Sequence, residues 1–301
     1  MPELPEVEAL RLSLKPYIIG QKIQNVSVLM PKLVSGTGTK RGTGSLLQAQ
    51  EFEKNLRNRT IIDITRRAKN IIIELDNGSI LLIHLKMTGQ LVFVPHNSDE
   101  KIAFGGHPID LSFTTLPNKH TYVTFAFTDG NLYYNDVRQF GYLLHFPSQQ
   151  HLQQSGHFAD LGFEPLSPEF TLEAFKTALK KRTGNLKSLL LSQKVVVGIG
   201  NIYCDEVCFA SGIRPTRSVL TLSQHEIEDL YQSICHILPK AVELGGSSIS
   251  SYLLADGTRG NYAREHKVYN RGGKPCLVCG NVLTKIQLAG RTTVFCEFDQ
   301  K

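Results

Sequence analysis

The sequence predicts a multidomain α+β protein built from a β-sandwich with a leading helix, a helical domain and a small C-terminal β-hairpin module. Residues 22–146 are rich in β-branched and aromatic residues, whereas helical periodicity dominates after residue 150. Three of the six cysteines lie in the last 26 residues. A chain of 301 residues that is 41% hydrophobic can bury two or more cores. The expected domains are 2–150, 151–262 and 263–301.

The chain opens with MPELPEVEAL, which predicts the leading helix. Pro5 suits a first helical turn, and acidic residues such as Glu3 and Glu6 suit the positive end of a helix dipole. Leu10 and Leu14 lie one above the other on the predicted apolar face. Read alone, the segment is an ordinary helix start, because chain ends rarely hold enough order for chemistry.

Turn signals divide the next region into paired strands. The turn DNG separates NIIIEL from ILLIHL, and TDG separates YVTFAF from LYY. These hairpins predict an antiparallel sandwich or barrel. Residues 95–120 lack periodicity and contain GGHP, so they form either a mobile surface loop or a recognition element.

The second region contains four helical stretches with glycines after several of their ends. They are TLEAFKTALKKR, KSLLLSQ, NIYCDEVCFASG and SQHEIEDLYQSICHILPKAVELGG. Gly198 and Gly200 form a turn before a helix that starts at Asn201, and the backbone N–H groups of such a turn can cradle a phosphate. The nearby basic run at 180–182, with Lys187, adds positive charge, although such a run is usually a solvated helix face.

The tail predicts a zinc-finger-like hairpin. Cys276 and Cys279 form a C-x2-C pair, sixteen residues follow, and Cys296 is then followed at the same spacing by Asp299. Paired ligands on two tight turns suit a tetrahedral zinc ion. The fourth ligand in this spacing is normally cysteine, so the aspartate leaves two possibilities, a Cys3Asp zinc site or a finger without metal. We expect the other three cysteines to be buried within helices. They are Cys204, Cys208 and Cys235.

Bulk properties narrow the class of protein. The net charge of +6 and pI near 8.9 are consistent with a polyanionic partner. No run approaches the roughly 18 apolar residues of a membrane span, and no secretory signal opens the chain. We therefore expect a cytoplasmic protein that does not associate with membranes.

The whole chain resembles the formamidopyrimidine-DNA glycosylases. The matching motifs, in order, are PELPEVE, RRAKN, HLKMTG, NDVRQFG, VVGIGNIYCDE and LAGRTTVFC. The resemblance implies a β-sandwich, a helix–two-turn–helix domain and a zinc hairpin. It also implies excision of oxidised purines such as 8-oxoguanine and formamidopyrimidines from double-stranded DNA, followed by strand cleavage.

The resemblance gives the opening segment a catalytic interpretation. Removal of Met1 would leave Pro2 with a secondary amine that attacks the sugar C1′ and forms an iminium ion. Glu3 would be the general acid and base, and Lys69 would hold the phosphate of the lesion.

The resemblance also implies DNA contacts. Met87, Arg138 and Phe140 match the side chains that fill the gap left by a flipped nucleotide. A second set matches phosphate-binding positions and consists of Lys187, Asn201 and Arg291. Residues 245–269 resemble the segment that includes the loop over the extruded base, and Glu206 is either functional or structural.

The sequence therefore predicts a bifunctional DNA glycosylase and abasic-site lyase that acts as a monomer and carries one structural zinc ion. Two alternatives remain in the same scaffold, a glycosylase for oxidised pyrimidines and a non-catalytic damaged-DNA-binding homologue. The start PELPE favours the purine branch over the pyrimidine branch, whose start usually reads PEGPE. A zinc-ribbon RNA-binding protein would explain none of the N-terminal motifs.

Overall fold

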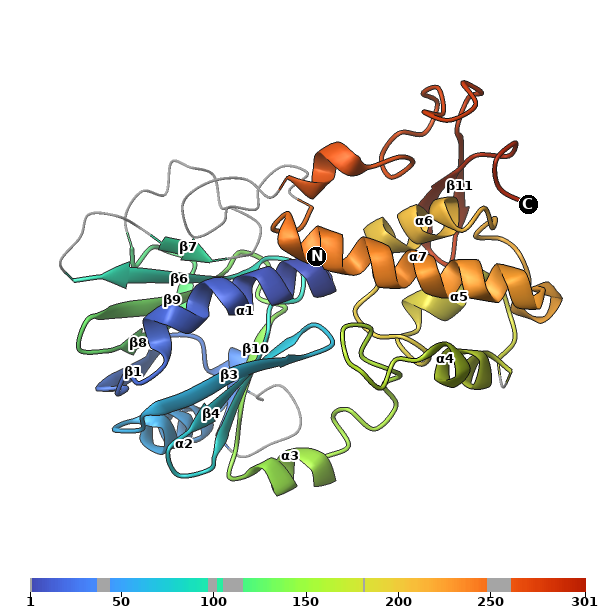
Figure 1. The fold of residues 1–301 in the computed structure, drawn as a ribbon. Coiled ribbons are helices and arrows are strands. Elements are labelled where there is room, and N and C mark those ends of the chain that lie inside the picture. The colour runs from blue at the N-terminus through green and yellow to red at the C-terminus, as the bar shows by residue number, and fades with distance from the viewer. Residues whose placement is uncertain (1, 37–43, 97–101, 105–115, 181, 248–260) are drawn as a thin grey trace. The chain divides into compact units, whose positions relative to one another are not determined.

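The computed structural model describes the chain except for residues 1, 37–43, 97–101, 105–115, 181 and 248–260 (Figure 1). It divides into two compact units. The first consists mainly of residues 6–159, and the second of residues 160–244 and 261–301 together with Glu3–Pro5. The C-terminal module, expected as a domain of its own, thus clusters with the helical residues.

The first unit is a β-sandwich. One sheet has the strand order β1-β8-β9-β6-β7 and the other β2-β10-β5-β4-β3. The strands are β1 (Asn25–Val28), β2 (Val34–Ser35), β3 (Ile61–Arg67), β4 (Asn70–Leu75), β5 (Ile80–His84), β6 (Gly89–Pro95), β7 (Ile102–Phe104), β8 (Thr121–Ala126), β9 (Gly130–Asp136) and β10 (Tyr142–Phe146). Nearly all neighbouring strands are antiparallel, and β2 with β10 is the parallel exception. The sandwich prediction is confirmed.

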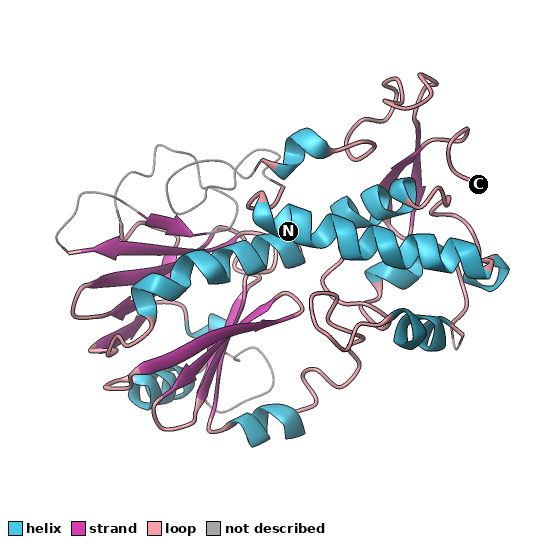
Figure 2. Cartoon of the chain, viewed as in Figure 1, coloured by secondary structure: helices cyan, strands magenta, loops and turns pink. Residues whose placement is uncertain are grey.

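The core of this unit lies between the two sheets and two helices, α1 (Leu4–Ile18) and α2 (Leu46–Leu56) (Figure 2). Leu10, Leu14 and Ile18 recur every four residues, so one face of α1 is buried in this core. The two predicted turns lie where hairpins form. The DNG turn connects β4 to β5, the TDG turn connects β8 to β9, and the strands of each pair are antiparallel. A short helix, α3 (Gln149–Gln154), follows β10.

The segment 95–120 differs from the predicted loop. Residues 102–104 form β7, which pairs with β6 at the edge of its sheet. Without β7, the strand β6 would be an edge strand with unpaired backbone groups, and any nearby segment can pair with such a strand. The pattern of residues within 95–120 does not reveal this pairing, because it depends on the backbone of β6. Most of the rest of this segment lies outside the described residues.

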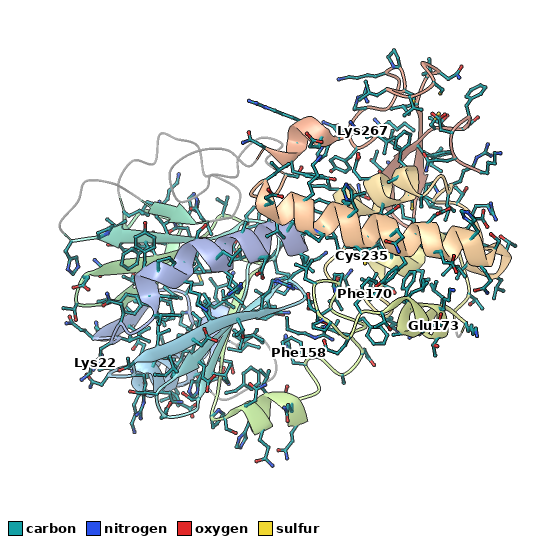
Figure 3. The ribbon with its side chains drawn as sticks, in the orientation of Figure 1. Lys22, Phe158, Phe170, Glu173, Cys235 and Lys267 are labelled. Carbon is teal, nitrogen blue, oxygen red and sulfur yellow. The ribbon has the colours of Figure 1, made fainter. Side chains whose placement is uncertain are left out.

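The second unit is helical. Its helices are α4 (Leu172–Leu179), α5 (Leu186–Leu191), α6 (Asn201–Ala210) and α7 (Gln224–Glu243). Ser223 and Glu226 close a capping box at the start of α7. Phe170, labelled in Figure 3, packs against Tyr231 of α7 in the core, with the two rings tilted. The expected burial holds fully for Cys204 and Cys208 and in part for Cys235, and no helix among the described residues is long and apolar enough to cross a membrane.

The C-terminal module is an antiparallel hairpin of β11 (Thr284–Leu288) and β12 (Arg291–Phe295), preceded by a 3-10 turn over Tyr262–Glu265. The chain end is tied to the helical residues. Arg214 donates to the carbonyl oxygens of Glu297 and Gln300, and the Gln300 side chain donates to the carbonyl of Ile213. These bonds explain why the module and the helices form one unit.

Candidate functional site

Glu3 is held at the start of α6. Its side chain is buried, and its two carboxylate oxygens accept backbone N–H groups from Gly200 at 2.6 Å, Ile202 at 2.9 Å and Tyr203 at 3.3 Å. A helix N-terminus stabilises an anion through unpaired N–H groups and the helix dipole. A Cβ at Gly200 would lie 2.4 Å from the Glu3 carboxyl carbon, so only glycine admits the carboxylate here.

This arrangement corrects one expectation. The turn before α6 was expected to present its N–H groups to a DNA phosphate, but Glu3 accepts those of Gly200 and of the first helical turn. The N–H of Gly198 donates to the Gln193 side chain at 2.7 Å. Gln193 also donates to the carbonyl of Ile199 at 2.7 Å and so ties the turn together. The turn therefore serves the chain's own carboxylate.

Pro2 and Lys69 belong to the first unit, and both are buried. Lys69 lies in the β3–β4 turn, where Ala68 has a φ of 53°. The Arg66 side chain donates to the carbonyl of Ala68, which fixes this turn. A lysine at a hairpin tip is ordinarily exposed, so the 7% exposure of Lys69 argues against an ordinary solvated role.

The structure brings Met87, Arg138 and Phe140 together. Arg138 Nη1 lies 3.0 Å from the Met87 sulfur, and the guanidinium carbon lies 4.7 Å from the centroid of the Phe140 ring. Met87 is 38% exposed and Phe140 45%, so two apolar side chains that contact the same guanidinium group are open to solvent. The three residues come from two loops, β5–β6 and β9–β10.

Asp136 joins these two loops. It accepts hydrogen bonds from the Thr88 hydroxyl and, at 2.8 Å, from the Gly141 N–H. The Thr88 hydroxyl oxygen in turn accepts the N–H of Arg138 at 3.0 Å. Asp136 is fully buried, so this network fixes the backbone below the exposed side chains.

The expected phosphate contacts in the second unit separate into two groups. Arg291 is exposed at the start of β12, and Asn201 is half-buried at the start of α6, where its side chain donates to the carbonyl of Thr292 at 3.0 Å. Lys187 is completely buried, and its Nζ lies 2.6 Å from Asp205 Oδ1. A buried ammonium group that is paired inside the protein does not reach a phosphate, so this placement argues against the expected contact for Lys187.

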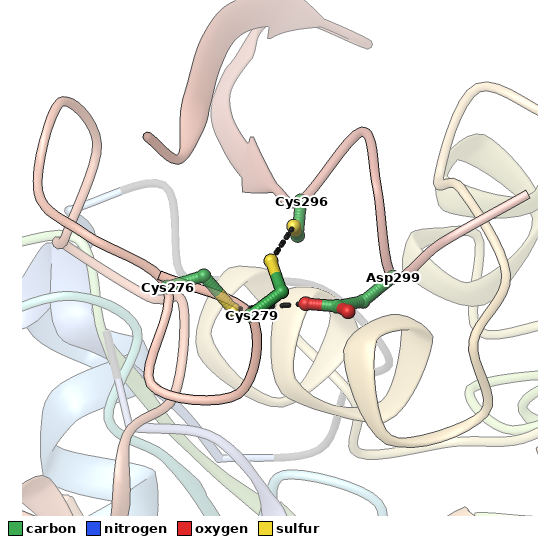
Figure 4. A group of neighbouring side chains, drawn as sticks. All are labelled: Cys276, Cys279, Cys296 and Asp299. Carbon is green, nitrogen blue, oxygen red and sulfur yellow. Dashed lines mark hydrogen bonds between the residues drawn. The ribbon is translucent and has the colours of Figure 1, made fainter. Parts of the chain in front are cut away.

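The four predicted metal ligands converge (Figure 4). Their ligand atoms all lie within 4.8 Å of one another. Cys279 Sγ lies 3.5 Å from Cys296 Sγ, and Cys276 Sγ lies 3.0 Å from Asp299 Oδ2. A tetrahedral zinc ion with Zn–S bonds of about 2.3 Å separates its sulfur ligands by roughly 3.8 Å, so the four residues fit one zinc ion.

Two further polar residues of the first unit have contacts that the sequence did not predict. Glu6 is buried and accepts the N–H of Ser247 at 2.7 Å, at the edge of the segment 248–260 that lies outside the described residues. His84 accepts the Lys86 N–H on Nδ1 at 2.9 Å. Burial, with the charges of Lys86 and Lys69, lowers the pKa of His84 to about 3. The glutamate repeat in PELPEVE and the histidine of HLKMTG were the available signals.

Comparisons with known proteins agree along the whole chain. Residues 1–143 match the formamidopyrimidine-DNA glycosylase N-terminal domain, residues 161–252 the H2TH domain of the same proteins, and residues 273–301 the zinc finger found in FPG and IleRS. The formamidopyrimidine-DNA glycosylase of Carboxydothermus hydrogenoformans is 36% identical over the full length of both chains. That of Bacillus cereus is 38% identical over 100% of this chain and 99% of its own.

Solved structures give the same result. A Lactococcus lactis Fpg in complex with DNA containing an abasic site matches with a TM-score of 0.83 and 35% identity, covering 99% of each chain. The wild-type enzyme from the same organism, in complex with DNA containing N7-benzyl-Fapy-dG, matches with a TM-score of 0.83 over the full length of both chains.

The fold, the clustered side chains and these matches define a DNA glycosylase of base-excision repair with the abasic-site lyase activity typical of such enzymes. The chain belongs to the formamidopyrimidine-DNA glycosylase family, and its last module is the zinc finger of that family.

Proposed function

We propose that this enzyme removes oxidised purines, such as 8-oxoguanine and formamidopyrimidines, from double-stranded DNA and then cleaves the strand by β,δ-elimination. The observation that carries the proposal is a proline at position 2, directly before the buried Glu3, in a chain of this family. Removal of Met1 would make Pro2 the chain terminus. An α-amino group titrates near pH ~8, so a useful fraction is unprotonated at neutral pH.

The chemistry follows from a secondary amine. The Pro2 nitrogen attacks the sugar C1′, the bond from C1′ to the base breaks, and the base leaves with the bonding electrons and takes up a proton. Opening of the sugar ring gives an iminium ion that carries a permanent positive charge. This ion withdraws electrons as a proton leaves C2′ and the 3′ phosphate departs, and the 5′ phosphate departs in a second elimination.

Other residues supply positioning and proton transfer. Glu3 exchanges protons with the opening sugar, and the N–H groups at the start of α6 hold its carboxylate in place. Lys69 and the exposed Arg291 bind phosphates. The neighbouring side chains of Met87, Arg138 and Phe140 fill the gap left by the flipped nucleotide.

The zinc ion would have a structural role. Bound by Cys276, Cys279, Cys296 and Asp299, it would join the two turns that flank the β11–β12 hairpin and so support Arg291. The bacterial relatives support a cytoplasmic location, where chromosomal DNA is the substrate. We further infer that the enzyme acts as a monomer.

Borohydride trapping on duplex DNA with a single 8-oxoguanine tests the nucleophile. The wild-type protein should form a covalent adduct at residue 2, and Pro2→Gly, which replaces the secondary amine, should lose trapping while binding of lesion DNA changes little.

Glu3→Gln should lose base excision but retain much of its cleavage of preformed abasic sites, because the abasic aldehyde already reacts with an amine.

The results also separate the alternatives. An adduct with oxidised pyrimidines alone would favour the related pyrimidine branch. Specific binding without any adduct would indicate a non-catalytic homologue. Undiminished trapping by protein that retains Met1, verified by mass spectrometry, would rule out Pro2 as the nucleophile.

A further inference from the structure

The Lys187–Asp205 pair is the most buried ion pair among the described residues. The side chains are 0% and 1% exposed, and Nζ lies 2.6 Å from Oδ1. Burial raises the pKa of Asp205 to about 6 against the opposing effect of Lys187, so the carboxyl group is ionised at neutral pH. An ion pair in such a place costs desolvation that its attraction alone rarely offsets. A specific use of its remaining hydrogen bonds would account for its presence.

Those remaining bonds converge on one strand. Lys187 Nζ also donates to the carbonyl of Thr292 at 3.2 Å, and Asp205 Oδ2 accepts the N–H of Val294 at 3.0 Å. Residues two apart in a strand direct their backbone groups to the same edge. β12 pairs with β11 along its other edge, so the pair from α5 and α6 satisfies the edge that the hairpin leaves open.

Two of the expected phosphate contacts, Asn201 and Arg291, lie next to this edge. Asn201 donates to the carbonyl of Thr292, the group that Lys187 also binds, and Arg291 is the residue before Thr292. Asn201 begins α6 one turn before Asp205. The backbone that follows Arg291 is therefore bonded to α6 at two points, by Asn201 at Thr292 and by Asp205 at Val294.

Glu206 anchors the beginning of the module in a similar way. Its buried carboxylate accepts the N–H groups of Lys267 at 2.9 Å, Val268 at 3.0 Å and Tyr269 at 2.7 Å. Adjacent carboxylates on α6 thus hold two separate segments of the C-terminal module. None of these bonds involves the predicted metal ligands, so docking onto α6 and zinc binding are separate supports.

We propose that Lys187 and Asp205 are positioning residues that fix β12 against α6, so that Arg291 and Asn201 present one phosphate-binding surface. This inference rests on the proposed function, because it assumes that Arg291 binds DNA. It replaces the expected phosphate contact of Lys187 with an indirect role.

The test uses the full-length protein and a duplex containing tetrahydrofuran, an abasic analogue that does not react. Lys187→Met and Asp205→Leu should each weaken binding and lower the melting temperature, because each leaves one buried charge unpaired. The double variant should recover part of the stability, because no buried charge is left unpaired, but it should bind as weakly as the single variants, because neither Met nor Leu can bond the Thr292 carbonyl or the Val294 N–H. Lys176→Met with Glu228→Leu, which replaces a more exposed ion pair of the same unit, is the matched control.

The salt dependence of binding distinguishes positioning from contact. In the Arg291→Ala background, Lys187→Met should cause no further fall in the slope of log affinity against log salt concentration, because the other residue that it positions, Asn201, carries no charge. A further fall of about 0.9 in that background would show that Lys187 itself neutralises a phosphate and would overturn the proposal. Wild-type affinity in both single variants would overturn it as well.

A second measurement reports directly on the docking of β12. In Asp205→Asn, hydrogen exchange at the Val294 amide should become faster, and adding Arg291→Ala should cause no further loss of affinity. Independent, multiplicative losses from the two changes would contradict positioning. If the wild-type protein does not prefer the abasic duplex over intact DNA, the proposed function fails, whereas the exchange at Val294 still reports on docking.

Discussion

His84 combines a fixed orientation with a suppressed charge. Its Nδ1 accepts the Lys86 N–H, so the hydrogen of the neutral ring is on Nε2. The ring lies 5.3 Å from that of Tyr142, centroid to centroid, and Tyr142 packs edge-on against His157. Because burial and the charges of Lys86 and Lys69 lower the pKa of His84 to about 3, the ring stays an uncharged donor at every physiological pH.

This lowered pKa predicts acid sensitivity. In the unfolded chain His84 binds a proton below pH ~6.5, whereas in the folded protein it does not until about pH 3, so its contribution to stability is lost as pH falls below 6.5. Between pH 6.5 and 5 the loss is about 1.6 kcal/mol. His84→Gln should therefore reduce the fall in melting temperature over this range. His225→Gln, at an 83% exposed histidine, is the control and should not. Equal pH dependence in wild type and His84→Gln would contradict the lowered pKa.

At the scale of elements, the C-terminal hairpin has a carboxylate, Asp299, as the fourth ligand of its zinc site. Zinc has no ligand-field preference, so three thiolates and one carboxylate can form its tetrahedral shell. Asp299→Ala should lower zinc affinity, and DNA binding should fall with it because Arg291 loses support, while the β-sandwich stays folded. Asp299→Cys should bind zinc more tightly without loss of excision. Competition with a chromophoric chelator measures zinc affinity. Fully active protein without zinc, purified in the absence of chelators, would contradict a structural ion.

The elements themselves were largely predictable, because turn signals and periodicity are local. The DNG and TDG turns located two hairpins, and the cysteine spacing located the metal ligands. What the sequence could not reveal depends on partners far along the chain. In the sequence Lys187 resembles a solvated basic residue, and only the fold shows that it is buried and paired with Asp205 of the next helix. Glu3 likewise gains its backbone donors from residues about 200 positions away.

At the scale of the whole molecule, the proposed phosphate contacts are distributed over both units. Lys69 belongs to the first unit and Arg291 to the second. The net charge of +6 is modest, so affinity should depend on these specific positions more than on a general positive field. If each residue binds its own phosphate, the effects of the two residues on binding should add.

Salt-dependent binding to the tetrahydrofuran duplex measures this addition. Lys69→Ala and Arg291→Ala should each lower the slope of log affinity against log salt concentration by about 0.9, and the double variant by roughly 1.8. Lys22→Ala is the control (Figure 3). Lys22 is exposed beyond the far end of α1, whose 15 residues span about 22 Å, whereas Pro2 precedes its start. Lys22→Ala should leave the slope unchanged. If all three single variants lowered the slope equally, affinity would come from net charge, and neither Lys69 nor Arg291 would be a specific phosphate contact.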